Sequence, residues 1–457
     1  MNDLSQLKRT LTGEVIEPED ERYEPGKEAF YREFNRRRPL ALIRVARPSD
    51  VPKVIQFAGE TGVKLAVRAG GHSLLGHSLI DGGLVLDLSA LRTIRIDADG
   101  RSATAGGGVL AGEYTLKAAE FGLATGFGDT GSVGIAGLTL GGGVGFLHRK
   151  IGLTIDNLLG AEIVTADGAI RQIDHERDSD LFWAIRGGGG SFGVVTELEY
   201  RLHPVDSVVG GMLILPATPQ AVTDFVATAR EASEDLSAIA GLMVAPPMPF
   251  LPEEVHGQMV LMLMMVHLGD PPRAEKEIER FRRIAQPLVD TVHPMPYTEM
   301  FPPEEGGPPH PEAMTVFSIY SDDFTLDDAS SSLEALRNSA ASMSVVQIRV
   351  LGGAVARVPA DATAFPHRNR EMIINVAAAF EDPAERPDHQ VWADNLATRL
   401  QRGVPGGYLN FLGDDSTGSV RAAFPGGTWE RLVAVKSKYD PNEVFASTYR
   451  IPPRPVE

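Results

Sequence analysis

The chain has 457 residues, a net charge of −18 at pH 7, 43% apolar residues and no cysteine. This length suits two or three domains, and the negative charge disfavours nucleic acid and anionic membrane surfaces as partners. The absence of cysteine excludes disulfides and thiolate metal sites, and the histidines show no metal-ligand spacing, so we expect no metal. The longest apolar run, Met259–Val266, is too short to span a bilayer, and the first residues contain no signal-like apolar region. We therefore expect a cytoplasmic protein without a membrane partner.

The first part of the chain shows short helix and strand patterns in succession. A polar segment up to about residue 40 is expected to wrap around the rest of the molecule. Ser49 is predicted to cap a helix that begins near Val51 and stops at Gly62, and a strand over Val63–Val67 follows. The other elements predicted in this part are strands over Leu84–Leu88 and Ser102–Ala105, a helix over Thr115–Phe121, and a hairpin of Ala161–Thr165 with Ala169–Ile173.

The stretch Arg68-Ala69-Gly70-Gly71-His72-Ser73 follows the strand that ends at Val67. Two glycines let a backbone turn sharply and approach a ligand closely, and successive N–H groups in such a turn can cradle a phosphate. The imidazole that follows is mostly neutral at pH 7 and is then nucleophilic. The stretch therefore indicates a nucleotide cofactor that is attached covalently, and an ordinary loop histidine is the alternative.

The segment Gly126–Gly145 contains nine glycines in twenty positions, with apolar residues between them. Glycine disfavours a regular helix by about 1 kcal/mol per residue relative to alanine, so we expect a structured loop and no helix. A glycine-dense apolar loop suits close backbone packing along a large flat ligand. A tightly packed turn region is the alternative interpretation.

The segment Gly188–Gly193 fits a dinucleotide-binding fingerprint and a nucleophile-elbow motif, and we discount both. The G-x-G-x-x-G fingerprint and the G-x-S-x-G elbow both require a strand before the glycines and a helix after them. Here a helix-like segment, Asp180–Ile185, comes first and a strand-like segment, Val194–Leu198, follows. The order of elements is therefore the reverse of what either motif needs.

After His203-Pro204 the pattern changes to longer strands and amphipathic helices, which predicts an α+β domain with a mostly antiparallel sheet. The methionine-rich strand Met259–Met265 is interpreted as core more readily than as a ligand surface. The predicted strands are Leu213–Leu215, Gln258–Leu268, Thr315–Ile319, Ser344–Leu351 and Met372–Ala379. The predicted helices are Ala221–Glu234, Arg273–Ala285, Leu326–Ala341 and Pro387–Arg402.

Eight motifs together resemble one known family, the berberine-bridge-enzyme-like FAD-linked oxidases of the vanillyl-alcohol oxidase and para-cresol methylhydroxylase superfamily. Each motif is weak alone, but all eight occur in the right order and span most of the chain. They are Arg68–Ser73, Gly128–Gly137, Gly141–Gly145, Arg149–Asn157, Leu181–Gly193, Phe365–Arg368, Tyr408–Phe411 and Lys438–Phe445.

The resemblance implies an α+β fold with a two-subdomain FAD-binding domain of the vanillyl-alcohol oxidase type and an inserted α+β substrate domain, whose mostly antiparallel sheet is covered by helices. The N-terminal part of the FAD-binding domain would span residues 1–205 and the substrate domain residues 206–404. Residues 405–457 would return to the FAD-binding domain. His72 matches the histidine that relatives bond covalently to FAD. The residues expected to bind the cofactor are Arg68, Ala69, Gly70, Gly71, His72, Ser73, His77, Ser78, Gly128, Asp129, Thr130, Val133, Gly134, Gly137, Leu140, Gly141, Gly142, Gly145, Asn157, Gly193, Val194, Tyr408 and Asn410.

The chain departs from the family pattern at three positions. Thr130 stands where many relatives carry a second flavin-attaching cysteine, so we expect a single attachment, through His72. Leu138 stands where many relatives carry a histidine. Arg357 stands where some relatives carry a glutamate that acts as the catalytic base. We therefore do not expect this chain to catalyse alkaloid ring closure.

The resemblance predicts an FAD-dependent oxidase that transfers hydride from an amine or alcohol carbon of a small molecule or sugar to flavin N5, with dioxygen as electron acceptor and hydrogen peroxide as product. Tyr408, Asn410, Val133 and Arg357 are the expected catalytic residues, with Val133 admitting oxygen and Tyr408 or the Asn410 amide positioning substrate. Arg357 would orient an acidic or hydroxylated substrate, or make a surface ion pair. A flavin dehydrogenase with another acceptor and a flavin-containing protein that sequesters a drug are the alternatives. The substrate and the oligomeric state stay open.

Overall fold

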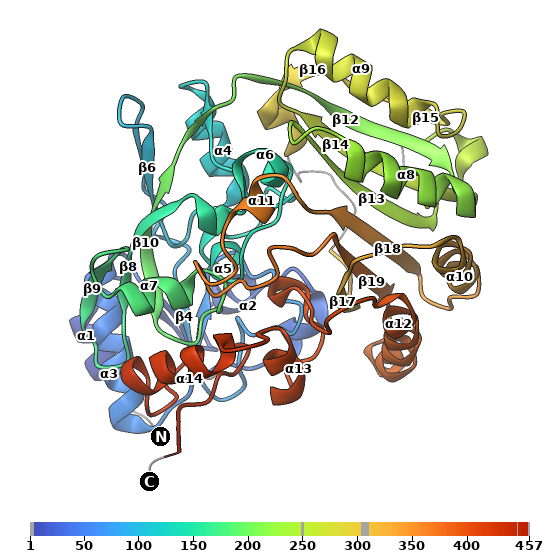
Figure 1. The fold of residues 1–457 in the computed structure, drawn as a ribbon. Coiled ribbons are helices and arrows are strands. Elements are labelled where there is room, and N and C mark those ends of the chain that lie inside the picture. The colour runs from blue at the N-terminus through green and yellow to red at the C-terminus, as the bar shows by residue number, and fades with distance from the viewer. Residues whose placement is uncertain (1–3, 248–250, 303–309, 446, 456–457) are drawn as a thin grey trace.

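The computed structural model describes residues 4–247, 251–302, 310–445 and 447–455, which form an α+β fold with three main sheets (Figure 1). Two smaller sheets come from the first half of the chain, and a large antiparallel sheet comes from the second half. Among these residues no helix has the length and apolar character needed to cross a bilayer. The α+β class expected from the sequence is confirmed.

The first sheet has four strands in the order β1-β2-β4-β3, and the last three are parallel. Helix α3 (Val51–Thr61) makes the crossover from β2 to β3 and ends at Gly62, whose φ of 70° favours glycine. Ser49 does not cap this helix; a 3₁₀ turn precedes it, and the buried Asp50 carboxylate accepts backbone N–H groups of the N-terminal segment instead. The strands are β1 (Glu14–Ile16), β2 (Ala41–Arg44), β3 (Leu65–Arg68) and β4 (Leu84–Asp87).

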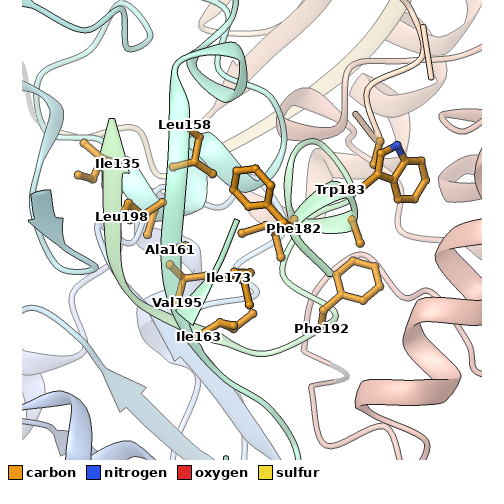
Figure 2. Close-up of a cluster of buried hydrophobic side chains, with 14 of the residues drawn as sticks. Ile135, Leu158, Ala161, Ile163, Ile173, Phe182, Trp183, Phe192, Val195 and Leu198 are labelled. Atoms are coloured by element: carbon orange, nitrogen blue, oxygen red, sulfur yellow. The ribbon is translucent and has the colours of Figure 1, made fainter. Parts of the chain in front are cut away.

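The second sheet is antiparallel, with five strands in the order β5-β6-β10-β8-β9. Figure 2 shows its apolar face, where Leu158, Val195 and Leu198 lie near Phe182 and Phe192 in one buried cluster. Helices α4 and α7 add to the same cluster, and C-terminal helix α14 packs against α7. The elements are β5 (Ile94–Asp97), β6 (Ser102–Gly106), β8 (Leu158–Val164), β9 (Ile170–Ile173), β10 (Val194–Arg201), α4 (Ala111–Ala119), α7 (Ser179–Ile185), α14 (Thr428–Tyr439) and the two-stranded β7 (Leu123–Ala124) with β11 (His203–Pro204).

The large sheet has eight strands, and its path runs β15-β12-β14-β13-β18-β19-β17, with β16 paired to β12. Helices α8, α9, α10 and α12 pack on the face of the sheet that lies away from the first two sheets (Figure 1). The strands are β12 (Ser207–Pro216), β13 (Leu236–Val244), β14 (Met259–His267), β15 (Val289–Asp290), β16 (His293–Pro296), β17 (Ala313–Ser321), β18 (Met343–Val350) and β19 (Met372–Phe380). The helices are α8 (Pro219–Glu231), α9 (Pro271–Arg282), α10 (Leu326–Arg337) and α12 (Arg386–Leu400).

Three differences from the sequence-based elements have a physical reason. A six-residue helix, α5 (Ile135–Leu140), forms inside the glycine-rich segment, contrary to the expectation of a loop, because Gly137 is the only glycine within its span. Helix α4 begins at Ala111, four residues before the predicted start, where the Glu113 carboxylate accepts the Leu110 N–H. Strand β13 was not predicted, because its small residues give no clear alternation. The domain limits expected from the resemblance stay a prediction.

Candidate cofactor and substrate site

A cavity of about 370 Å³ lies where five separate parts of the chain meet. The Gly70–Ser78 loop and the glycine-rich segment from Gly128 to Val144 form two of its sides. Residues of the N-terminal segment, the Gly189–Val195 turn and the C-terminal part complete it, namely Phe30, Tyr31, Gly189, Gly190, Gly193, Val195, Tyr408, Leu409, Asn410, Phe411, Phe445, Ser447, Thr448 and Tyr449.

Glycine is required at several points of this wall because backbone segments touch there. A Cβ atom at Gly70 would overlap the backbone of Gly134, and one at Gly134 would overlap Gly70 in return. A Cβ atom at Gly141 would overlap the Asn410 amide, and one at Gly145 would overlap the Phe127 carbonyl oxygen. The two predicted glycine segments therefore lock against each other, and this contact defines the cavity.

His72 lies at the cavity wall beside the glycine-rich segment. Its Nε2 is 2.9 Å from the Ser132 hydroxyl oxygen, and its ring stacks on Phe30 at a centroid distance of 4.2 Å. A hydroxyl on one ring nitrogen fixes the orientation of the imidazole and favours one tautomer. The histidine that the sequence singled out is therefore held in place at the cavity.

The cavity wall offers backbone and hydroxyl groups that have no bonding partner among the described residues. The N–H groups of Gly70, Gly71, Ser73 and Leu74 donate to no acceptor within the described parts of the chain. The Ser78 hydroxyl is buried and also unpaired there. No lysine or arginine is among the cavity-lining residues, so a phosphate in this cavity would depend on backbone N–H groups. These features fit the extended dinucleotide that the resemblance implies.

Tyr408 and Asn410 come from the C-terminal part and contact the glycine-rich segment. The Tyr408 hydroxyl oxygen accepts the Gly143 N–H at 2.8 Å and the Asn410 amide at 2.9 Å, and the Val144 N–H lies 3.3 Å away. Burial raises the pKa of the Tyr408 phenol, so the group stays neutral at physiological pH. Tyr408 thus holds the loop as a hydrogen bond acceptor, and the geometry argues against its use as a proton-abstracting base.

Asp129 forms a charged contact that joins the cavity wall to the large sheet. Its Oδ2 is 2.5 Å from Nη2 of Arg349 on β18, and its Oδ1 accepts the Thr130 hydroxyl at 3.2 Å. Arg349 is buried and also donates to the Val144 carbonyl at 3.3 Å. The ion pair therefore ties the glycine-rich segment to the substrate-side sheet.

Most residues predicted to bind the cofactor come together at this cavity, and their roles stay a prediction. Five of them lie just outside its lining. Arg68 donates to the carbonyl groups of Gly26 and Glu28, and the Asn157 amide bonds the carbonyls of Ile151 and Leu153. The other three, which pack behind the wall, are Gly142, Gly145 and Val194.

Arg357 requires a correction. It ends a short helix, α11 (Ala354–Arg357), forms an ion pair with Glu234, and its side chain is 60% exposed. The glycine pair before it, Gly352-Gly353, turns the chain away from the sheet at positive φ, so the residue does not line the cavity. Of the two roles considered from the sequence, the surface ion pair is the one that the structure shows.

Several lining residues were missed from the sequence. Phe30 and Tyr31 gave no motif, and Tyr449 lies beyond the last matching one. Three residues of the large sheet, Arg349, Gln347 and Asn375, were also missed. Which side chains of a strand point toward the cavity cannot be assigned before the register of the strand is known. The only available signal was the presence of polar residues within otherwise apolar strands.

Comparisons with known proteins agree with this geometry. Residues 39–174 match the FAD binding domain family, and residues 407–452 match the berberine and berberine-like family. The chain is 30% identical to (R)-6-hydroxynicotine oxidase of Paenarthrobacter nicotinovorans over 97% of both chains. The crystal structure of 6-hydroxy-D-nicotine oxidase from Arthrobacter nicotinovorans has a TM-score of 0.86, 27% identity, and coverage of 97% of this chain and 99% of that one. A berberine-bridge-enzyme-like protein of Physcomitrella patens shares the fold, with a TM-score of 0.88 at 23% identity over the whole of both chains.

Proposed function

Because this chain belongs to the berberine-bridge-enzyme-like family of FAD-dependent oxidoreductases, we propose that it oxidises an amine or alcohol carbon of a small molecule, with dioxygen as electron acceptor. The observation that carries the proposal is the cavity where His72, the interlocked glycines and the Tyr408–Asn410 pair meet. The chemistry that FAD supplies when bound is acceptance of a hydride from the substrate, followed by electron transfer to dioxygen with release of hydrogen peroxide.

The residues that would hold the cofactor are those with unpaired groups at the cavity. The N–H groups of Gly70, Gly71, Ser73 and Leu74, which donate to no described residue, suit the pyrophosphate, and the Ser78 hydroxyl offers a further hydrogen bond. The Gly141–Val144 backbone, braced by Tyr408, would lie against the flat ring. Water would be excluded by the aromatic side chains of Tyr31, Phe411 and Tyr449.

We propose that His72 carries the flavin covalently and is its only point of attachment. The Ser132 hydroxyl orients the imidazole, which supports His72 as the residue that would hold the flavin. The new bond would replace an N–H bond of the imidazole and a C–H bond of the flavin methyl group, with the flavin itself taking up the two electrons. Thr130 replaces the cysteine of many relatives and its hydroxyl donates to Asp129, so no thioether can form. The cytoplasmic location expected from the sequence stays a prediction that cell fractionation would test.

Oxygen reactivity separates the oxidase from the dehydrogenase alternative. The purified yellow protein is reduced anaerobically with dithionite and mixed with aerated buffer, and the return of flavin absorbance is followed together with peroxide formation. An oxidase reoxidises faster than free reduced FAD under the same conditions. Reoxidation no faster than that of free FAD would contradict the oxidase and favour a dehydrogenase.

A further inference from the structure

The large sheet presents one row of side chains that runs across four strands opposite the cavity. Met262 on β14 pairs with Gly241 on β13, Gly241 pairs with Gln347 on β18, and Gln347 pairs with Asn375 on β19. Directly paired residues of antiparallel strands point to the same face of a sheet. The four residues therefore form a single row with an apolar end at Met262 and a polar end at Asn375.

Arg349 identifies which way this face is turned. It lies two residues after Gln347 on β18, so both side chains point to the same side. Its guanidinium reaches Asp129 and the Val144 carbonyl, which both line the cavity. The row therefore faces the cavity, whereas the alternate residues Val346 and Ile348 pack under the covering helices.

The apolar end of this face is only partly covered: Met262 and Met243 pack against a small apolar cluster around Ile214 and Val260, and Met264 packs against another around Tyr297. Met262, Met264 and Met243 are half-buried, although they point toward the other half of the molecule. Met265 of the same strand points the opposite way and is fully buried in the helix-covered core, as the sequence suggested for the whole strand. Methionine side chains adapt to irregular apolar ligands because they are flexible and polarizable. Gly241 leaves a dent between these methionines and Gln347, where a Cβ atom would meet only ordinary contacts.

The polar end has one unused donor and one unused acceptor. Arginine can only donate, so the Arg349 Nε contact of 3.0 Å identifies the Gln347 atom that faces it as the amide oxygen. The same oxygen accepts the Asn375 amide nitrogen at 3.1 Å, which leaves the Asn375 Oδ1 on the far side. Asn375 is 3% exposed, and this Oδ1 is buried without a partner. The Gln347 amide nitrogen likewise donates to no described residue.

The charges at this end cancel. Arg349 donates three of its five N–H groups to Asp129, Gln347 and the Val144 carbonyl, and Asp129 pairs its charge, so it attracts a further anion only weakly. The Asp129 carboxylate is occupied by Arg349 and Thr130, so it offers little to a cation. A charged ligand group would have to break this pair, which is costly for partly buried charges.

We infer that this row selects an uncharged, largely apolar substrate with one hydroxyl or amide-like group, which the Asn375 Oδ1 and the Gln347 amide bind while the methionines cover the apolar part. The inference rests on the proposed function and chooses among the substrates that it leaves open. It excludes oligosaccharides, because a sugar would place several hydroxyls against methionine side chains and leave them unpaired.

The test is a binding titration of the intact yellow protein, with the absorbance change of the bound flavin as readout. The probes are 2-naphthol, its size-matched analogue 2-methylnaphthalene, 2-naphthoate and cellobiose. Naphthol is expected to bind about tenfold more tightly than methylnaphthalene, the scale of one buried hydrogen bond. Naphthoate and cellobiose are expected to cause no change at the same concentrations.

The variant Asn375→Leu keeps the side-chain volume and removes the acceptor. It is expected to weaken naphthol binding about tenfold and to leave methylnaphthalene binding unchanged, so the second probe controls for altered packing. Equal naphthol binding by the variant and the parent, tighter binding of cellobiose or naphthoate, or no spectral response to either apolar probe would each overturn the inference. If Asn375→Leu does not fold, the four-probe comparison on the parent protein decides it. Flavin content and oxygen reactivity of the same preparation report separately on the proposed function.

Discussion

The two sides of the site differ in the groups that line them, which are backbone on one side and side chains on the other. The side near His72 consists of glycines whose backbones touch, as at Gly70 and Gly134. The side that faces it is a sheet whose exposed groups are side chains, as at Met262 and Gln347. On the glycine side an atom added at Gly70, Gly134 or Gly145 meets backbone, whereas on the sheet side we expect a substitution to change the group presented to the substrate without moving the strand. The first arrangement suits an invariant ligand, and the second suits a substrate that differs between relatives.

The largest effect is expected for substitution of His72, on the glycine side. His72→Ala should abolish covalent attachment, so acid precipitation should release all flavin into the supernatant. His77→Ala is the matched control, because His77 also lines the cavity and is predicted to leave attachment intact. Mass spectrometry of the denatured proteins measures both results. Covalent flavin in the His72 variant would show that the attachment site is another residue.

A change of pH should loosen the contact between the two sides. Burial lowers the pKa of His148 and of His367 to about 4, from 6.5 in an exposed histidine. A lowered folded-state pKa gives stability that is complete above pH 6.5 and is lost as pH falls toward 4, on the order of 3 kcal/mol for each group. Denaturant unfolding at pH 7.5 and 5 measures this. His367→Gln should flatten the dependence, and an unchanged slope would contradict the assignment.

Adding one carbon to the glycine side should destabilise the protein strongly. Gly145→Ala would place its Cβ against the Phe127 and Gly128 carbonyl oxygens, and overpacking against backbone costs about 3 kcal/mol. Gly59→Ala, in helix α3 with nothing near its Cβ, is the control and should stabilise by about 0.5–1 kcal/mol. Chemical denaturation compares the two. If both variants matched the parent protein, the glycine side would be more plastic than the contacts indicate.

A smaller effect is expected on the rate of reaction with oxygen when Val133 is enlarged. Val133 lines the cavity within the glycine-rich segment, and Val133→Leu adds one methylene at the position expected to admit oxygen. Reoxidation of the reduced protein is expected to slow about tenfold, the lower end of what an added methylene achieves by blocking a small ligand. Anaerobic reduction by substrate should be nearly unchanged. Equal slowing of both half-reactions would indicate general damage to the site.

The smallest effect is expected on the sheet side. Met262→Leu conserves volume at a half-buried position, so the free energy of unfolding should change by less than about 1.5 kcal/mol. The ratio of naphthol to methylnaphthalene affinity should also persist, because the polar end of the row is untouched. Differential scanning calorimetry and the flavin titration measure these two quantities. A loss of stability as large as that expected for Gly145→Ala would remove the contrast between the two sides.

The same contrast explains what could be predicted from the sequence. Backbone contacts require glycine, so Gly70, Gly71 and the Gly126–Gly145 segment were recognisable, and most residues predicted there line the cavity. The substrate side depends on strand register and on contacts between distant segments, which one sequence does not encode locally. This is why Arg357 was named from the sequence and Arg349 was missed. The α+β class and most elements of the large sheet followed from hydrophobic periodicity, whereas β13 lacked such a pattern.

The cavity takes its walls from both ends of the chain, from Phe30 and Tyr31 near one end to Tyr449 near the other. A nascent chain on the ribosome therefore cannot enclose a ligand until Tyr449 has been synthesised. The glycine-rich segment, made early, must wait for Tyr408 and Asn410 before its hydrogen bonds to the C-terminal part can form. We expect cofactor loading to need the chain up to Tyr449, so a premature stop before Tyr449 would yield colourless protein even with every earlier residue present.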